Sequence, residues 1–529
     1  MTSLLILLGI VVASYTCYQA LILKVSRPSG FFLNWNTNAA FMGMILLPLS
    51  ARYLLKERLS SALIIGFIIF TITLTISRGA LLGLFFGLVL IYSAKSKQQN
   101  SLAPLLRLTA WLVFGFFIGN SVLSQFLGQE SVGAKLLETI QATQQAITAS
   151  DVQVIDKDSE VGEQQELGHK PLLKIASGRH YLWDAAWRMY QDKPVLGWGI
   201  GTYHWLYPQY RSAEYGELGQ FAHNDYLQYL MELGPLGLLL ILVFTGAVFI
   251  QVWRIPQQVV NRPERLEMLG YAAACIAFLI HTGLTFHFYQ AAMLIIFGLY
   301  LGLMSQGLST RQFVAKRKIM RQRCFVGLVS LCLLCIVSLG TLFSGFNALP
   351  KQQDKISPQQ VFINLTAAIQ RTPYIEELVA FQSSVLVDLL IEQPKAQSPT
   401  QRKALMLYAL TLVDQAIASN SLRARNYYNR AQLLSMLPHS SGRQQKILQA
   451  YQQALMCNPY YLQVRINYAL ALMSQQQLEQ GRLVLRQGLN RFYEEEYGIT
   501  LRYLQLLITV SDDNAAKDNY KAIFKKVKN

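Results

Sequence analysis

The chain has 529 residues, of which 52% are hydrophobic and only 15% are charged. Soluble domains usually carry about a quarter charged residues, so most of this chain is not expected to be soluble. The net charge of +17 does not indicate nucleic-acid binding, because the basic residues lie in short connectors between apolar segments rather than on one helix face. The cysteines lie mostly within apolar segments, which argues against a disulfide framework.

Nine apolar segments are long enough to cross a bilayer as helices, which takes about 20 residues. They cover residues 3–23, 38–55, 61–77, 79–94, 107–127, 234–253, 268–284, 288–306 and 325–345. The first has no basic residues before it and no cleavage site, so we interpret it as a helix rather than a signal peptide. The pattern predicts a mainly α-helical, polytopic membrane protein, with N-terminal membrane helices in residues 1–127 and C-terminal ones in residues 234–347.

Basic residues in the short connectors predict the orientation of these helices. Four clusters of Lys and Arg follow the second, fourth, sixth and eighth segments, and one orientation places all four in the cytoplasm. The N-terminus is then cytoplasmic, and the region after the ninth segment lies on the opposite side of the membrane.

The same orientation leaves residues 128–233 as one long loop on the outer face. Loops longer than about 15 residues are uncommon and are usually functional. Residues 129–168 are rich in polar side chains, whereas the sequence from Ser177 onward is dense in Trp, Tyr, Gly, His and Arg. We therefore expect a functional site in the second part of this loop.

Arg78 lies between the third and fourth apolar segments. An arginine at membrane depth is costly unless it is paired or hydrated, which makes it a candidate functional residue. The alternative is an arginine whose side chain reaches the lipid headgroups. Ser77 and Gly79 beside it favour a backbone break that lines a cavity.

Two arginines flank two tryptophans in the aromatic part of the loop. Arg179 is followed by Trp183, Trp187 and Arg188 at helical spacing. Two guanidinium groups on one short helix suit a phosphate group, whereas the tryptophans suit an amphipathic helix at the membrane surface. Both interpretations can hold together.

Residues 194–201, PVLGWGIG, look like a nucleotide-binding glycine loop, but the flanking strand and helix of that motif are missing. We interpret them as a tight turn packed on the membrane surface. His223, in the sequence HNDY, is suited to general-base catalysis because the ordinary pKa of histidine lies near neutrality. Asp225 or Glu232 is expected to orient its ring, as carboxylates do in hydrolytic triads.

Possible metal ligands are sparse. Asp156 and Asp158 have the Asp-x-Asp spacing used by metal-dependent glycosyltransferases, but no second cluster lies beside them. His281 and His287 are six residues apart in another connector, where carboxylates are absent. We expect no metal and no other cofactor.

Residues 348–529 are helical in pattern and form the predicted C-terminal domain. Tyr451 and Ala454 fit the second helix of a tetratricopeptide repeat, and Leu485 and Gly488 follow them by 34 residues. We expect two or three helical hairpins. Such stacks present a concave surface, usually to a peptide or protein.

Five ordered motifs resemble the O-antigen ligase-like superfamily, over roughly residues 25–305. They are RPSGFFLNWNTNAA (27–40), SRGALLGL (77–84), SGRHYLWDAAWRMYQDKPVLGWGIGTY (177–203), HNDYLQYLMELGPLGL (223–238) and HTGLTFHFY (281–289). With the helical-repeat region after the last membrane helix, the chain looks most like bacterial protein O-oligosaccharyltransferases of the pilin-glycosylating type.

The resemblance implies transfer of a preassembled glycan from undecaprenyl pyrophosphate to a serine or threonine hydroxyl, in the periplasm and without metal or nucleotide. His223 matches the family's catalytic histidine, and Arg179 and Arg78 match the two arginines that hold the pyrophosphate. The residues expected to bind substrate are Arg188, Asn224, Tyr226, Asn34, Arg27 and His281.

The resemblance also implies partners and a location. The expected partners are a lipid-linked oligosaccharide donor and an acceptor, which is a pilin-like protein or lipid A-core. The expected location is the bacterial inner membrane, with a periplasmic catalytic loop at residues 128–233 and a periplasmic C-terminal domain. Two alternatives stay open: a lipid A-core O-antigen ligase or O-antigen polymerase, and a non-catalytic membrane scaffold.

Two departures from the superfamily pattern accompany the resemblance. Members usually carry several more helices before the first motif, so we expect either a truncated start or a reduced membrane domain. The connector at residues 281–289 lacks the acidic residue and the proline expected there, and has Thr285, Phe286 and His287 instead.

Overall fold

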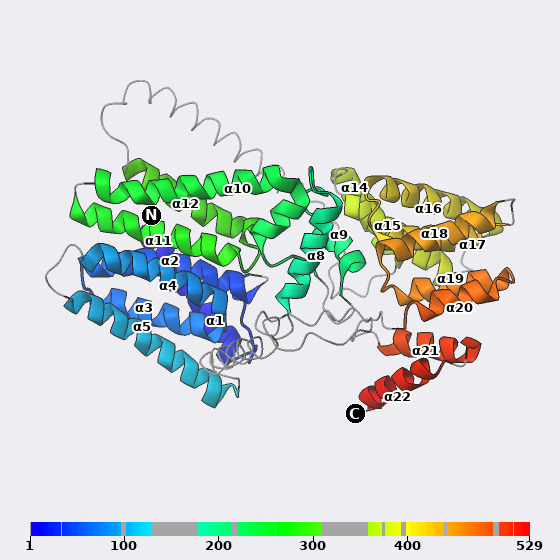
Figure 1. Cartoon of the computed structure of the whole chain (residues 1–529), viewed down its shortest axis with the longest axis horizontal. Coiled ribbons are helices and arrows are strands. Elements are labelled where there is room, and N and C mark those ends of the chain that lie inside the picture. The colour runs from blue at the N-terminus through cyan, green and yellow to red at the C-terminus, as the bar shows by residue number, and fades with distance from the viewer. Residues whose placement is uncertain are drawn as a thin grey trace, which may run out of the picture. The chain divides into compact units, whose positions relative to one another are not determined.

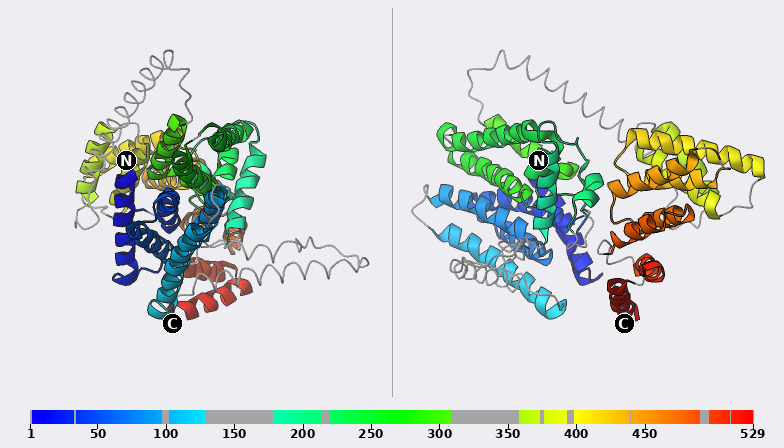
Figure 2. Two further views of the ribbon diagram at one scale, coloured as in Figure 1. Left: turned by 90° about the vertical axis from the view of Figure 1, so that its left-hand side faces the viewer. Right: turned by 45° about the vertical axis from the view of Figure 1, so that its right-hand side comes forward.

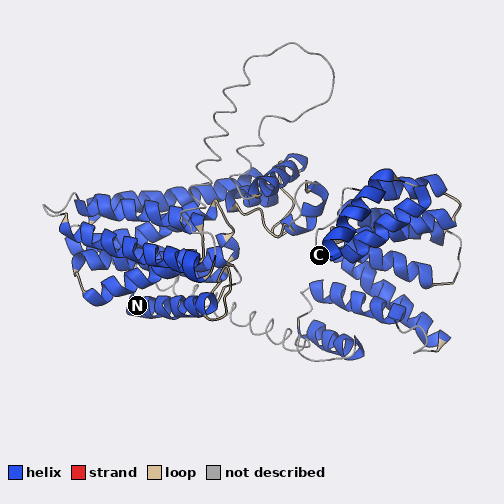
Figure 3. Ribbon diagram, turned by 90° about the horizontal axis from the view of Figure 1, so that it is seen from below, coloured by secondary structure: helices blue, strands red, loops and turns tan. Residues whose placement is uncertain are grey.

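The computed structural model of the chain describes residues 2–32, 34–96, 102–128, 178–212, 219–259, 261–307, 358–372, 376–392, 398–438, 440, 442–489, 497–511 and 513–528. These residues form helices joined by turns and loops, with no strand among them (Figure 3). The chain divides into two compact units, Met1–Tyr203 with Gln220–Gln312 and His204–Gly219 with Phe313–Asn529. The second unit thus combines the C-terminal helices with a short piece of the long loop.

The first unit is a helical bundle (Figures 1 and 2). Its helices are α1 (Thr2–Leu21), α2 (Trp35–Leu55), α3 (Leu59–Leu74), α4 (Arg78–Ser96), α5 (Ala103–Ser121), α8 (Arg179–Asp192), α10 (Asp225–Gln258), α11 (Arg262–Thr282) and α12 (Ala291–Gly307). A π-helical turn, η1 (Val122–Phe126), extends α5, and a 3₁₀ turn, η2 (His287–Tyr289), precedes α12. Helix α2 packs against α3, α4 and α11, and α3 also packs against α5.

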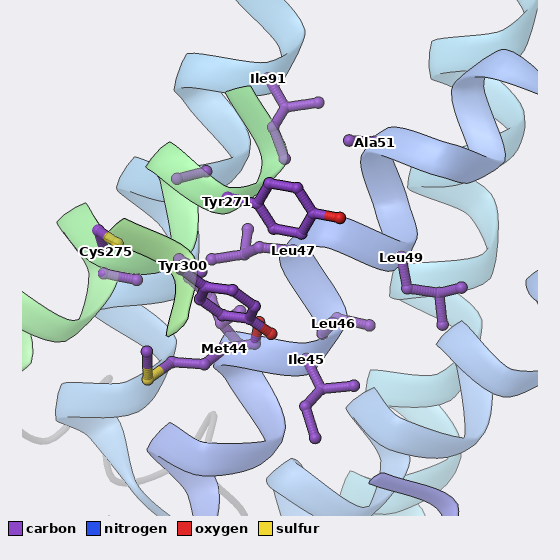
Figure 4. Close-up of a cluster of buried hydrophobic side chains, with 14 of the residues drawn as sticks. Met44, Ile45, Leu46, Leu47, Leu49, Ala51, Ile91, Tyr271, Cys275 and Tyr300 are labelled. Carbon is purple, nitrogen blue, oxygen red and sulfur yellow. The ribbon is translucent and has the colours of Figure 1, made fainter. Parts of the chain in front are cut away.

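Helix α2 is the centre of this unit, and nearly all of its side chains are buried. An apolar helix without a polar face belongs in a core. Pro48 lacks the N–H that would bind the carbonyl of Met44 one turn earlier. The hydroxyl of Tyr300 from α12 donates to that carbonyl at 3.0 Å, and Figure 4 shows Tyr300 beside Met44. The tyrosine satisfies the carbonyl that the proline leaves open.

Small residues allow neighbouring helices to approach closely. A Cβ added at Gly83 of α4 would lie 2.8 Å from the carbonyl oxygen of Ala277 in α11. One added at Gly119 of α5 would lie 2.9 Å from the carbonyl oxygen of Phe70 in α3. Such contacts are typical of membrane bundles, where association depends on close packing rather than on a hydrophobic force between helices.

Apolar side chains are also exposed on the outside of the bundle, as at Phe85, Phe117 and Leu240. Within the described residues, five helices are long and apolar enough to cross a membrane. They span Leu4–Leu21, Trp35–Leu55, Arg78–Lys95, Ala103–Phe126 and Asp225–Gln257. Shorter apolar helices cover Leu59–Leu74 and Ala291–Ser305. These features are those of a multi-pass membrane protein.

Eight of the nine predicted segments overlap a helix of the first unit, and the ninth, 325–345, lies outside the described residues. The number of nine crossings therefore stays a prediction. The sixth segment was expected to begin at residue 234, whereas α10 begins at Asp225. The backbone of α10 breaks at Gly234, with φ 68° and ψ −167°. The apolar pattern begins at this break, because the first turns of the helix are polar and aromatic.

The second unit contains paired helices. They are α14 (Pro358–Arg371), α15 (Glu376–Glu392), α16 (Pro399–Ser419), α17 (Ala424–Met436), α18 (Arg443–Cys457), α19 (Leu462–Ser474), α20 (Leu478–Arg486), α21 (Tyr497–Ser511) and α22 (Asn514–Lys528). Consecutive helices pack together, as in α15 with α16, α17 with α18, and α19 with α20. The helices pair as expected, but the nine helices among the described residues are more than two or three hairpins contain. The likeness to a tetratricopeptide repeat stays a prediction.

Replacing Tyr300 with phenylalanine removes the donor to the buried carbonyl of Met44. An unsatisfied buried carbonyl costs about 1–3 kcal/mol, so Tyr300→Phe should lower the thermal unfolding midpoint of the purified protein in detergent. Tyr271→Phe is the matched control, since the Tyr271 hydroxyl donates to a partly exposed carboxylate, that of Glu267, which water can hydrate instead. Equal midpoints for the two variants would contradict a structural role for the Tyr300 bond.

Candidate functional site

A turn from the long loop completes the break in α10. Pro235 has no N–H to donate to the carbonyl of Met231, and the break also leaves the carbonyl of Glu232 without its helical donor. The backbone N–H groups of Trp198 and Gly199 donate to these two carbonyls, at 3.2 and 2.8 Å respectively. The loop therefore supplies the hydrogen bonds that a continuous helix would have made.

Glycine is required on both sides of this contact. Gly197 and Gly234 have φ values of 67° and 68°, in the left-handed region that other residues rarely adopt. A Cβ at Gly197 would lie 2.5 Å from the backbone of Glu232, and one at Gly234 would meet the carbonyl of Val195. Residues 194–201 thus form a tight turn, as expected from the sequence.

The tip of this turn is apolar and exposed. Val195, Leu196 and Ile200 are 73%, 82% and 67% exposed. On α10, directly after the break, Leu236 and Leu240 are exposed as well. Exposed apolar side chains next to an apolar helix face suit contact with lipid, although packing on the membrane surface stays a prediction.

Helix α8 begins with Arg179, directly after Gly178 with φ 77°. The side of α8 that packs against α10 is apolar, and its buried residues are Leu182, Ala185, Ala186 and Met189. The indole N–H of Trp198 donates to the carbonyl of Met189 at 2.7 Å. The turn and α8 are therefore held to the same part of α10, which fixes the position of Arg179.

The structure does not bring Arg188 to Arg179. Nine residues separate them, which is about two and a half helical turns, so their side chains leave opposite sides of α8. Arg188 forms an ion pair with Asp184 at 2.8 Å, on the exposed side of the helix. The expected clamp of two guanidinium groups on one helix is therefore wrong.

His223 precedes α10 in a strained backbone conformation. Its φ is 53°, a left-handed value that costs a residue with a side chain roughly 1 kcal/mol. The Asn224 side chain caps α10 by accepting from the N–H of Leu227 at 3.2 Å. The Gln228 side chain accepts from the N–H of Ala222 at 3.0 Å. Hydrogen bonds on both sides of His223 hold this conformation.

The His223 ring lies among aromatic side chains. It meets the edge of Phe286 at 5.0 Å between ring centroids, and Phe286 stacks on Phe221 at 4.2 Å. Burial, with a further contribution from the positive charge of Arg179, lowers the pKa of His223 to about 4. At neutral pH the ring is therefore uncharged and can accept a proton.

Asp225 and Glu232 tie α10 to the η2 turn. Asp225 accepts from the backbone N–H of Phe288 at 2.8 Å. Glu232 accepts from the hydroxyl of Tyr289 at 2.6 Å. Nδ1 of His223 is buried and has no hydrogen-bond partner among the described residues. Neither carboxylate bonds Nδ1 of the ring, so the expectation that Asp225 or Glu232 orients His223 stays a prediction without support from these contacts.

The joint before α4 lies against the end of α11. A Cβ at Gly79 would lie 2.7 Å from Nε2 of His281, so glycine is needed for this approach. Nδ1 of His281 is 3.0 Å from Nε2 of His287, and both residues are buried. The exposed side chain of Arg78 thus begins next to a buried pair of histidines.

Arg179 connects these groups through its charge, which acts on the rings of both His223 and His281. The start of α8, the residue before α10 and the end of α11 therefore converge. The contact between Gly79 and His281 adds the start of α4 to the same cluster. Of the predicted catalytic residues, Arg179 lies near enough to His223 for its charge to act on the ring, and Arg78 adjoins Gly79, which approaches His281.

The first motif contacts the α4 joint at a second point. Asn34 caps α2 by accepting from the N–H of Asn36 at 2.7 Å. The Ser77 hydroxyl donates to the Asn36 side chain at 2.8 Å. The guanidinium group of Arg27 lies 4.9 Å from the centroid of the Trp35 ring. Asn34 and Arg27 therefore stabilise the entry to α2.

Tyr226 has a comparable role, since its hydroxyl donates to the carbonyl of Leu279 in α11 at 2.9 Å. Sequence reasoning gave no site role to Phe286, which meets the His223 ring, or to Phe221, which stacks on Phe286. Their only signal is that each lies within two residues of a motif histidine, and aromatic residues are frequent throughout the chain. Sequence reasoning weighed His281 and His287 as possible metal ligands and predicted no metal; in the structure their rings pair with each other.

Among the described residues, no group of three or more His, Cys, Asp or Glu side chains is arranged to hold a metal ion. His281 and His287 form only a pair. Asp156 and Asp158 lie outside the described residues. A site without metal stays a prediction.

Residues 62–242 match the family model for O-antigen ligase. This match supports the O-antigen ligase-like superfamily, and with it a glycan-transferring enzyme of the inner membrane. The O-antigen ligase match contains Arg78, Arg179 and His223 and ends within α10, whereas residues 281–289 follow it. A comparison with curated proteins finds no match to this chain.

Gly234→Ala should disrupt the site from within α10. The new Cβ would meet the Val195 carbonyl and impose a left-handed φ on alanine, which together should cost about 2 kcal/mol or more. The expected result is a lower thermal unfolding midpoint and faster proteolysis of the 194–201 turn. Gly246→Ala is the control in the same helix, because its Cβ would meet no atom. If Gly234→Ala has the same unfolding midpoint and the same rate of proteolysis as Gly246→Ala, the 194–201 turn does not pack against α10 as described.

Proposed function

We propose that this protein transfers a preassembled glycan from undecaprenyl pyrophosphate to serine or threonine hydroxyls of periplasmic proteins such as pilin. The observation that carries the proposal is an uncharged His223 under the positive charge of Arg179, within the stretch that matches O-antigen ligase. A base beside a cation suits a reaction in which a hydroxyl loses a proton while a pyrophosphate gains negative charge.

In the proposed step, the acceptor hydroxyl attacks the anomeric carbon of the glycan. The bond from that carbon to the acceptor oxygen forms as its bond to the pyrophosphate oxygen breaks. His223 takes the hydroxyl proton, and the electron pair leaves with the pyrophosphate. Arg179 and Arg78 hold that leaving group and stabilise its charge. Because pyrophosphate leaves readily, positioning supplies much of the rate.

His281 would complete the pyrophosphate end of the site, since its ring lies within the influence of Arg179 and against Gly79. Arg188 lies on the opposite side of α8 from Arg179 and pairs with Asp184. We therefore assign Arg188 no part in donor binding.

Four other residues would act on the shape of the site. Asn224 and Tyr226 fix the first turn of α10, through the cap and the bond to α11. Asn34 and Arg27 fix the first turn of α2. Their proposed contribution is to hold the substrate-facing ends of these helices rather than to react.

One feature supports a C-terminal domain on the same side of the membrane as the loop at residues 128–233. Residues 204–219 of the loop belong to the same compact unit as the C-terminal helices, which supports placing both on one side of the membrane. Helices α10, α11 and α12 lie between them in the chain, so a further crossing is needed, and the apolar segment 325–345 would supply it. We infer a cytoplasmic N-terminus and a periplasmic C-terminal domain.

The O-antigen ligase match is equally consistent with a sugar acceptor, either lipid A-core or a growing O-antigen chain. The helical hairpins of the second unit favour a protein acceptor, because such stacks offer a surface for peptides and proteins. A non-catalytic scaffold would not need Arg179, His223 and His281 in one cluster.

His223→Ala should abolish transfer by removing the base, which is worth about 100-fold or more in rate. The assay expresses the chain in a host that makes a lipid-linked glycan, with pilin present, and measures the mass of intact pilin and the banding of lipopolysaccharide. Arg179→Ala should give a similar loss, and Arg188→Ala on the same helix should keep transfer.

The acceptor in this assay separates the candidate functions. Glycan on pilin supports the proposal, whereas glycan on lipid A-core or longer glycan chains would replace it with a ligase or a polymerase. Full transfer by His223→Ala would rule out His223 as the base. If no acceptor receives glycan, the chain is better explained as a non-catalytic membrane scaffold.

The pH dependence of transfer should reflect the lowered pKa of His223, about 4 in the free protein. The base is active when deprotonated, so kcat/KM should stay level from pH 8 to pH 6 and fall only near pH 4. Bound pyrophosphate is anionic and offsets the charge of Arg179, so it raises the pKa of His223 and moves the acid limb of kcat to higher pH. An acid limb of kcat/KM near 6.5 would contradict the buried setting of the ring.

A further inference from the structure

We propose that the C-terminal unit positions the catalytic histidine by holding the loop segment that leads to it. This inference rests on the proposed function and adds a part for the C-terminal unit in the reaction. The segment comprises the described residues 204–212 and 219, which begin in α9 (Tyr203–Tyr210) and belong to the same compact unit as the C-terminal helices. The residues that hold it are Tyr460 and Arg423.

Arg211 makes the central contact. Its side chain is only 6% exposed, and its guanidinium carbon lies 4.4 Å from the centroid of the Tyr460 ring. The hydroxyl of Tyr460 donates to the backbone carbonyl of Arg211 at 3.2 Å. One tyrosine therefore binds both the charge and the backbone of the same residue, and cation–π contacts of desolvated arginines are the stronger ones.

The surroundings of Tyr460 make this contact rigid. Tyr460 lies between α18 and α19, and its N–H donates to the Asn458 side chain at 3.0 Å. Its own side chain is 4% exposed. A second cation–π contact joins Arg423, just before α17, to the ring of Trp205 at 5.2 Å. The C-terminal unit thus touches α9 and the residue that follows it.

The far end of the segment folds back on α9. Gly219 lies so close to the ring of Tyr207 that an added Cβ would be 2.7 Å from it, and Tyr207 is buried. The chain then returns to the first unit at Gln220. His223 follows three residues later, in the left-handed conformation described above.

Because Gly219 and His223 are only four residues apart, the contact of Arg211 with Tyr460 can affect the conformation of His223. A strained conformation persists only when its surroundings impose it. The bonds of Asn224 and Gln228 impose it from the α10 side. The packing of Gly219 imposes it from the other side, because it limits the course of the three residues in between. Loss of the Tyr460 contact should therefore loosen the His223 segment.

Hydrogen exchange of the full chain in lipid nanodiscs tests this without an assay of transfer. Tyr460→Ala should speed exchange of residues 204–212 and 219–224 by about tenfold or more, as expected when a local unit opens. Tyr460→Phe keeps the ring over Arg211 and should stay near the wild type. Tyr408→Ala is the control in the C-terminal unit, because Tyr408 lies exposed on α16. Arg211→Ala removes the same contact from the loop side.

Transfer by the same variants provides the second measurement. Tyr460→Ala and Arg211→Ala should lower kcat by roughly 10-fold or more, since misplacement of a reacting group slows chemistry. The KM for the lipid-linked donor should stay constant, because the arginines that bind it are elsewhere. Tyr460→Phe should restore most of kcat.

Three results would overturn the proposal. The first is unchanged exchange at residues 204–212 in both Tyr460→Ala and Arg211→Ala. The second is faster exchange at residues 204–212 while exchange at residues 219–224 stays slow. The third is an unchanged kcat although exchange is faster in both of these stretches. If the wild-type chain transfers no glycan, the proposed function fails, and exchange at residues 219–224 still decides whether the C-terminal unit holds the histidine segment.

Discussion

The site depends on how the break in α10 is satisfied. A helix interrupted by Gly234 and Pro235 leaves backbone carbonyls that lipid cannot hydrate. The loop supplies the missing donors from Trp198 and Gly199, and the same tryptophan binds the last turn of α8. Completing one helix therefore fixes a second, and the arginine at its start comes to rest beside the histidine that precedes α10.

Charge and burial then act together on His223. The aromatic surroundings of the ring and the cation of Arg179 both oppose its protonation. The carboxylates of Asp225 and Glu232 accept hydrogen bonds from the η2 turn, and neither is among the causes of the lowered pKa of His223. In the proposed reaction, the free protein holds a neutral base under the charge of Arg179, and an anionic donor supplies the charge that makes the base stronger.

The sequence predicts the apolar helices and the residues Arg179 and His223, because long apolar runs and motif spacing are local properties. It does not predict the start of α10 at Asp225, since residues 225–233 mix apolar and polar side chains, and the break that follows them is satisfied by bonds from the loop. The placement of Arg188, in contrast, follows from the sequence alone. Nine residues along a helix put its side chain on the opposite face from that of Arg179. Arg211 and Tyr460 are 249 residues apart in the chain, and no local sequence pattern predicts their contact.

That separation has a consequence for how the chain matures. Synthesis proceeds from the N-terminus, and domains fold as they emerge. The membrane helices and α8 can pack early, but Trp205 and Arg211 cannot make their contacts until Arg423 and Tyr460 have been made. With the role proposed for the C-terminal unit, the histidine segment is completed last, and a chain that still lacks Tyr460 has its reactive centre unassembled.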